Sequence, residues 1–245
     1  MHYCGVVPVS SLLQLAMLEE VRAPEPPIRL AATFFEPGLA LQVAAELRAL
    51  REVVVAVAAP AAAGRACDEI LRGKGVPPAP LHPEAARLFD ELAGLGLFSP
   101  LAGDGGGHEV EPLDTPAAGT GLEGAVPEGA FREAPVFETN VEAVFCALQG
   151  HRLPARRHPL GVRLRVEELL RHHVVDPGDL WNRRIEEVEA AGAALCAHRY
   201  AVGPAHWLGR IEEGVLVLPG SSVPEEFARE GVVPPVPRLQ LPPLE

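Results

Sequence analysis

The order of apolar segments at the start of the chain constrains the fold more than any other feature. Residues 3–9, 12–18 and 28–35 are short apolar segments separated by turn-forming residues, and they predict three strands. Residues 36–51 carry leucine and valine at helical spacing, which predicts a helix. Residues 53–57 (VVVAV) form a β-branched run typical of a buried parallel strand. A meander of three strands followed by a helical crossover to a buried strand predicts a mixed α/β sheet.

We expect the whole chain, 1–245, to form one domain. Residues 60–133 are interpreted as an insertion between the fourth and fifth strands. The Gly/Pro/acid-rich part of it, 99–129, is predicted to be a loop with little regular structure. Further predicted elements are helices at 67–72, 84–95, 141–148, 162–173 and 179–200 (the last capped by Asp176 or Asp179), a strand at 134–138, and a hairpin of strands 207–211 and 215–218.

Composition narrows the class of function. The chain is 48% hydrophobic and 22% charged, which is typical of a globular protein. Its net charge of -12 argues against general binding to nucleic-acid backbones, because phosphates would be repelled. The four cysteines contain no C-x-x-C pair, and the chain has neither an apolar run of about 18 residues nor a charged signal-peptide start. We therefore expect a cytoplasmic protein without membrane contact.

The usage of a few residue types suggests a source. The sequence has one lysine, two asparagines and 26 prolines. Few amides and many prolines suit a thermophile, and arginine in place of lysine suits a bacterium with a GC-rich genome.

Three stretches of the C-terminal half carry a resemblance to a known family. They are VFETNVEAVFCALQGHRLP (136–154), HPLGVRLRVEELL (158–170) and RIEEVEAAGAALCAHRYAVGPAHWLGRIEEGVLVLP (184–219). In their order they resemble the domain-of-unknown-function family 429, whose members are regarded as predicted nucleases of the RNase H-like fold. The family pattern is a strand with a glutamate, a helix, a basic segment, an alanine-rich helix bearing an acid, and a hairpin.

The N-terminal half matches that family less closely. GVV at 5–7 takes the place of Gly-Ile-Asp, and VAAP at 57–60 takes that of Ile-Asp-Ala-Pro. GRACDEILRGKG at 64–75 resembles the family's Arg-x-Cys-Asp-x-x-Leu element. The resemblance covers most of the chain outside about 76–133. It implies an α/β fold of RNase H-like type, a mixed five-stranded sheet with helices on both faces, plus an insertion and a C-terminal hairpin.

The resemblance also implies four carboxylates, because two divalent cations need hard oxygen ligands to activate water and stabilise the leaving oxygen. At the four matching positions this chain has Val7, Ala58, Glu138 and Glu189. Valine and alanine cannot coordinate a cation, and two carboxylates would hold Mg²⁺ weakly. The first hypothesis is therefore a degenerate, catalytically impaired predicted nuclease that acts as a binding or pseudo-enzyme module, with no cofactor expected.

The second hypothesis is an active metal-dependent nuclease or phosphodiesterase. It would use Mg²⁺ or Mn²⁺ bound by Glu138, Glu189 and substitute acids of the insertion, such as Asp104 or Glu109.

Each acid also has a structural interpretation. Glu138 could cap the helix that follows Asn140. Glu189, with its neighbouring glutamates, could lie on a solvated helix face paired with Arg183 and Arg184. In the insertion, Arg65 and Asp68 are expected to form a structural pair at the start of a helix.

The segment 151–173 has an excess of positive charge, with six arginines and four histidines against two glutamates. It predicts contact with a phosphate or a nucleic acid, since guanidinium groups suit phosphate oxygens. The arginines predicted to make that contact are Arg152, Arg156, Arg157 and Arg163. The alternative, which is common for charge runs, is a surface helix and loop that pair with the protein's own acids.

Overall fold

One mixed sheet organises the part of the chain that the computed structural model describes, which is residues 1–24, 28–96, 123–126, 135–210 and 213–228. In chain order the elements are β1 (His2–Val9), β2 (Leu12–Arg22), β3 (Ile28–Phe34), α1 (Ala40–Ala49), β4 (Val53–Val57), α2 (Ala66–Gly73), α3 (Pro83–Gly94), β5 (Glu123–Ala125), β6 (Val136–Glu138), α4 (Val141–Gln149), α5 (Pro159–Arg171), β7 (Val174–Val175), the 3-10 turn η2 (Leu180–Asn182), α6 (Ile185–Val202), β8 (Ala205–Arg210) and β9 (Gly214–Pro219).

The strand order within the sheet is β5-β8-β9-β6-β4-β1-β2-β3-β7. β1 pairs antiparallel with β2 and parallel with β4, and β4 pairs parallel with β6. The predicted mixed α/β sheet is therefore confirmed, and so is the prediction that the first strand lies centrally beside the fourth. The backbone N–H of Ala58 donates to the carbonyl of Val6 at 2.8 Å, so Val7 and Ala58 are neighbours as expected.

The expectation of five strands is wrong, because the sheet of the described residues has nine. The C-terminal hairpin β8–β9 joins the sheet through β9, which pairs with β6. β5 and β7 extend the two ends of the sheet, and they are only three and two residues long. Strands this short show no two-residue periodicity in the sequence. β5 also lies inside the segment 99–129, where a loop was predicted; most of that segment lies outside the described residues.

The helix predicted over 179–200 is in fact a 3-10 turn followed by α6. Asp179 has a φ of 68°, and its side chain accepts the N–H of Trp181 at 3.1 Å. Arg183 and Arg184 then adopt extended backbone angles, so α6 begins at Ile185. The predicted cap by Asp179 exists, but it caps η2 and not the long helix.

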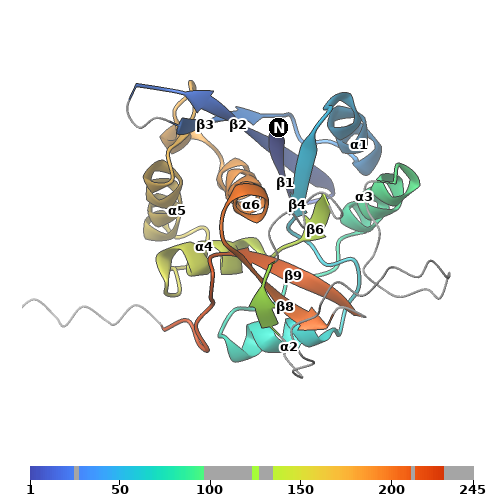
Figure 1. Ribbon diagram of the computed structural model, residues 1–245, viewed down its shortest axis with the longest axis vertical. Coiled ribbons are helices and arrows are strands. Elements are labelled where there is room, and N and C mark those ends of the chain that lie inside the picture. The colour runs from blue at the N-terminus through green and yellow to red at the C-terminus, as the bar shows by residue number, and fades with distance from the viewer. Residues whose placement is uncertain (25–27, 97–122, 127–134, 211–212, 229–245) are drawn as a thin grey trace, which may run out of the picture.

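Helices cover both faces of the sheet, as predicted (Figure 1). α6 crosses one face over β1 and β2, with α4 and α5 beside it, while α1 and α3 pack together on the other face. Two apolar cores result, one on each side of the central strands. Within the described part of the chain, no helix has the length and apolar character needed to cross a membrane.

α6 runs antiparallel to β1. Near its carboxyl end, the ring of His198 lies edge-on to Tyr3 with centroids 4.8 Å apart. At its amino end, Arg184 reaches Gln14, whose register partner on β1 is Val7. The amino terminus of α6 therefore lies over the carboxyl end of β1.

The chain's one lysine fastens the last described segment to the sheet. Lys74, which follows α2, is 4% exposed. Its ammonium donates to the carbonyl of Pro224 at 2.9 Å and pairs with Glu123 of β5 at 3.0 Å. Its own carbonyl accepts the N–H of Phe227 at 3.0 Å, and Phe227 is fully buried. Residues 220–228 are thus held against the body of the protein from two directions.

Replacing Gly5 by alanine tests the contact between α6 and β1. The new Cβ would overlap the backbone oxygen of Ala190 and the backbone nitrogen of Ala194. Because helix backbone cannot move aside cheaply, we expect the free energy of unfolding to fall by about 3 kcal/mol. Gly73→Ala, at a position with open space around it, is the matched control and should change it by less than about 1 kcal/mol. Denaturant unfolding measures both, and equal effects would contradict the close packing.

Candidate functional site

The carboxyl ends of the parallel strands β1, β4 and β6 meet at one edge of the sheet, where the resemblance places its acids. Val6 lies beside Val57, and Val57 beside Glu138, so Val7, Ala58 and Glu138 follow one another along this carboxyl edge. Val7 and Ala58 are buried within the larger apolar core. Neither side chain has an oxygen atom, so two of the four implied ligand positions cannot coordinate a cation.

Glu138 is bound by Arg65. The two guanidinium NH groups donate to the two carboxylate oxygens at 2.8 and 2.6 Å, and both side chains are buried. Burial raises the pKa of the Glu138 carboxyl, while the hydrogen bonds and charge of Arg65 oppose that rise. The interpretation of Glu138 as a helix cap is wrong, because Asn140 caps α4 by accepting the N–H of Ala143 at 3.0 Å. The positive charge beside the Glu138 carboxylate is therefore the guanidinium of Arg65.

The start of α2 positions Arg65. Asp68 accepts the backbone N–H groups of Gly64 at 3.1 Å and Arg65 at 3.3 Å, which fixes the turn into the helix. The expected pair at the helix start therefore uses the Arg65 backbone, while its side chain extends to β6. A cavity of about 10 Å³ lies at this pair, and its lining includes Pro60, Arg65, Asp68 and Glu138. A space of that size holds about one water molecule.

Glu189 is only 1% exposed, so its interpretation as part of a solvated face paired with Arg183 and Arg184 is wrong. Its partner is Arg156, at 2.5 Å, which reaches it from the loop before α5. Burial raises the pKa of Glu189 to about 7, and the charges of Arg156 and Arg165 oppose that rise. The second retained acid is therefore also paired with an arginine.

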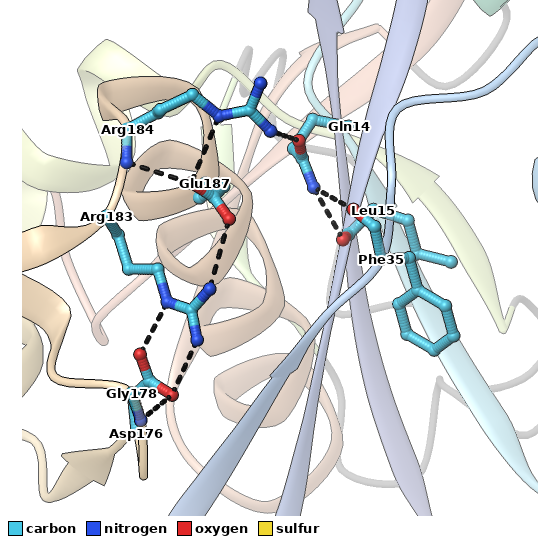
Figure 2. Close-up of polar contacts among 8 residues, drawn as sticks. All are labelled: Gln14, Leu15, Phe35, Asp176, Gly178, Arg183, Arg184 and Glu187. Carbon is cyan, nitrogen blue, oxygen red and sulfur yellow. Dashed lines mark hydrogen bonds and ion pairs between the residues drawn. The ribbon is translucent and has the colours of Figure 1, made fainter.

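The contacts first expected for Glu189 belong to Glu187. Its carboxylate accepts the backbone N–H of Arg184 at 2.9 Å and a guanidinium NH of Arg183 at 3.4 Å (Figure 2). Arg183 also forks onto Asp176, at 2.6 and 3.0 Å. These hydrogen bonds lower the pKa of the Asp176 carboxyl. The charges at the amino end of α6 are thus satisfied by one another.

Gln14 connects this group to the carboxyl edge. It is fully buried and faces Val7 across the β1–β2 pair. Its amide NH₂ donates to the carbonyls of Phe35 at 2.7 Å and Leu15 at 3.1 Å, and its oxygen accepts from Arg184 at 3.4 Å (Figure 2). Sequence reasoning missed Gln14; the signal available was a single polar residue in the apolar segment 12–18.

The arginines of the segment 151–173 mostly pair with the protein's own acids, as the alternative interpretation expected. The pairs are Arg156 with Glu186 and Glu189, Arg163 with Glu167, Arg165 with Glu142, and Arg171 with Glu168. Two of the four arginines predicted to contact phosphate, Arg156 and Arg163, are therefore engaged. For the other two, Arg152 and Arg157, the described residues provide no acidic partner.

The carboxyl edge does not fit a site for two divalent cations. Glu138 and Glu189 belong to separate ion pairs, and the other two implied positions carry no donor atom. Across the ranges described, no three His, Cys, Asp or Glu side chains gather in a group that could hold a metal ion. The chemistry of the donor set therefore argues against metal binding at this edge.

Breaking the pair of Arg65 and Glu138 from one side should cost more than removing both groups. Arg65→Met leaves a buried carboxylate without its cation, and we expect a loss of about 3 to 5 kcal/mol in unfolding free energy. Adding Glu138→Leu should recover most of that loss. Because burial raises the pKa of Glu138, the loss in the single variant should shrink as the pH falls and the carboxylate is protonated.

The control for this comparison is Arg163→Met, which removes an exposed pair with Glu167 on one helix. It should cost less than about 1 kcal/mol in denaturant unfolding. A loss as large as that of Arg65→Met would show that burial does not set the cost.

Glu189 should make stability depend on pH. Its pKa is raised from 4.5 to about 7 on folding, so the unfolded chain releases this proton at a lower pH than the folded protein. The free energy of unfolding should therefore fall as the pH rises through that window. Glu189→Gln should lack this part of the fall. The test is the difference between the two pH profiles, and parallel profiles would refute the prediction.

Comparison with known proteins gave no match to a family model, to a curated protein or to a solved structure. The resemblance to the domain-of-unknown-function family 429 therefore remains a hypothesis, carried by the motifs quoted above. The RNase H-like fold is likewise a hypothesis, whereas the strand pairing itself shows the mixed α/β sheet.

Proposed function

We propose that this protein is a catalytically impaired relative of RNase H-like nucleases that acts as a binding or pseudo-enzyme module. One observation carries the proposal: Arg65 makes a buried, two-pronged contact with Glu138, at the edge where a nuclease of this type would gather metal ligands. The guanidinium supplies the positive charge that a cation would otherwise bring.

The charge at this edge supports the proposal. Sites for two divalent cations bring several carboxylates together, and the cations offset the repulsion among them. Here Val7 and Ala58 contribute no charge, and Arg65 balances the one carboxylate of Glu138. The neighbouring carboxylate of Asp68 accepts the backbone N–H groups of Gly64 and Arg65, so a second cation would find no cluster of free carboxylates. The residues therefore suit a stable scaffold without metal.

The cysteines support a cytoplasmic location as part of the same proposal. All four are free and buried. Burial raises the pKa of the thiols of Cys67 and Cys146 to about 11, so these groups stay protonated and unreactive at neutral pH. Structural thiols of this kind suit a reducing compartment.

The phosphate or nucleic-acid contact of this module is assigned to Arg152 and Arg157. Arg156 and Arg163 hold acids of the same chain, which leaves their guanidinium groups less able to bind a phosphate. Such a contact would be local, since the whole chain carries a net charge of -12.

We expect nuclease activity with Mg²⁺ or Mn²⁺ at background level, and no tight binding of either ion in a calorimetric titration. Metal-dependent cleavage that disappears in the Glu138→Gln variant would overturn the proposal. It would favour the active nuclease, with further ligands such as Asp104 or Glu109, which lie outside the described residues. The assay uses single-stranded and double-stranded DNA and RNA.

Restoring the acids is the second arm of this test. Val7→Asp with Ala58→Asp should produce measurable cation binding, at some cost in stability, because carboxylates then cluster in a buried place. Val7→Asn with Ala58→Asn is the matched control, since it has nearly the same shape but adds no charge. Adding Arg65→Met to the aspartate pair should strengthen cation binding by releasing Glu138. Equal cation binding by the aspartate and asparagine variants would contradict the assignment of this edge.

A further inference from the structure

A groove lies between α1 and α3, on the face of the sheet opposite α6. Its volume is about 230 Å³, and its lining includes Leu39, Leu41, Glu84, Arg87, Asp90 and Glu91. The groove is close to the turn between β1 and β2, because His82, which precedes α3, contacts the carbonyl of Ser10 at 2.7 Å. The groove shares no lining residue with the cavity at Arg65 and Glu138 on the carboxyl edge, so the two are separate places on the protein.

Two leucines that line this groove are largely exposed to solvent, whereas other apolar residues of α1 are buried. Leu39 is 48% exposed and Leu41 is 65% exposed. α1 is anchored in the core by other residues, including Val43 and Leu47. The sequence pattern places Leu39 on the apolar stripe with these two, yet its side chain is half outside. Leu39 and Leu41 thus add little to the core, and covering them would release apolar surface from water.

The acids of the groove are not balanced. Glu84 is satisfied, because it accepts the backbone N–H of Ala40 at 2.8 Å and a guanidinium NH of Arg87 at 2.6 Å. Asp90 and Glu91 both lie about two turns further along α3, and the described residues form no ion pair with either of them. Two uncompensated carboxylates therefore lie beside two exposed leucines.

The groove is also rigid. The contact of Glu84 with Ala40 ties the first turn of α3 to the first turn of α1. Below it, Leu88 and Leu92 of α3 share a core with Val43 of α1. A preformed surface loses little conformational entropy when a partner binds, so even a small groove can bind usefully.

We propose that the groove between α1 and α3 binds a segment of a partner protein that presents an aliphatic side chain next to an arginine or lysine. The aliphatic group would cover Leu39 and Leu41, and the cation would pair with Asp90 or Glu91. The volume of the groove, about 230 Å³, is smaller than that of usual small-molecule sites, about 300 to 1,000 Å³. The groove therefore suits one or two side chains of a protein segment. The negative charge of the groove opposes a nucleic acid, and a net charge of -12 opposes a second copy of the chain. The inference is independent of whether the carboxyl edge cleaves anything.

The test uses the full chain and a fluorescently labelled peptide built of leucine, arginine and alanine, with binding followed by anisotropy. Leu41→Ala should weaken binding about tenfold, because it removes apolar contact at a position too exposed to matter for folding. Asp90→Asn with Glu91→Gln should weaken it by about threefold to tenfold and reduce its dependence on salt. A peptide with glutamate in place of arginine, and one with serine in place of leucine, should each bind worse than the first.

The matched control is Glu225→Gln with Glu226→Gln, which removes the same amount of charge from two exposed residues of the C-terminal segment. Binding should stay within about twofold of the unmodified chain. Equal weakening by the control would mean that the peptide follows net charge alone, and the proposal would fail. It would also fail if Leu41→Ala had no effect, if no binding occurred, or if Leu41→Ala abolished a dimer of the chain in sedimentation, which would assign the groove to a second copy.

Discussion

The contact between the backbone of α6 and the central strand β1 determines where the rest of the molecule lies. Gly5 has no side chain, so Ala190 and Ala194 lie directly against the strand. Other small side chains are buried along α6, and most of them are alanines. With the helix axis set in this way, the amino end of α6 closes over the carboxyl end of β1.

This placement decides which charged groups can meet. Residues on the first two turns of α6 face different neighbours, because successive helical positions are rotated by about 100°. Glu187 lies toward Arg183 and Arg184, whereas Glu189 lies toward Arg156 in the loop before α5. This separation explains why Glu187 contacts Arg183 and Arg184, as the solvated-face interpretation proposed, whereas Glu189 does not. The planar guanidinium of an arginine can also bind both oxygens of a carboxylate, which fixes the orientation of that carboxylate more than a lysine ammonium would.

The local features of the fold could be predicted from the sequence, whereas the contacts between distant segments could not. The β-branched run 53–57 and the apolar segments before it predicted their strands, because burial leaves a pattern along each element. The pair of Arg65 and Glu138 joins residues 73 positions apart, and neither residue type indicates its partner. The alternative interpretation placed Glu189 in solvent because glutamates surround it in sequence, but packing of α6 buries it. The short β5 and β7 exist only because a longer neighbouring strand supplies their hydrogen bonds.

Lys74 has a consequence for the chemistry that the protein can undergo. It is the one lysine of the chain, and its ammonium is enclosed by the carbonyl of Pro224 and the carboxylate of Glu123. Acylating reagents, and enzymes that attach acyl groups or small proteins to lysine, need an uncharged and reachable amine. The buried position of Lys74 keeps them from reaching this amine while residues 220–228 stay in place. The rate at which this side chain is acylated therefore reports how often the C-terminal segment detaches, and the folded protein is shielded from lysine-directed tagging.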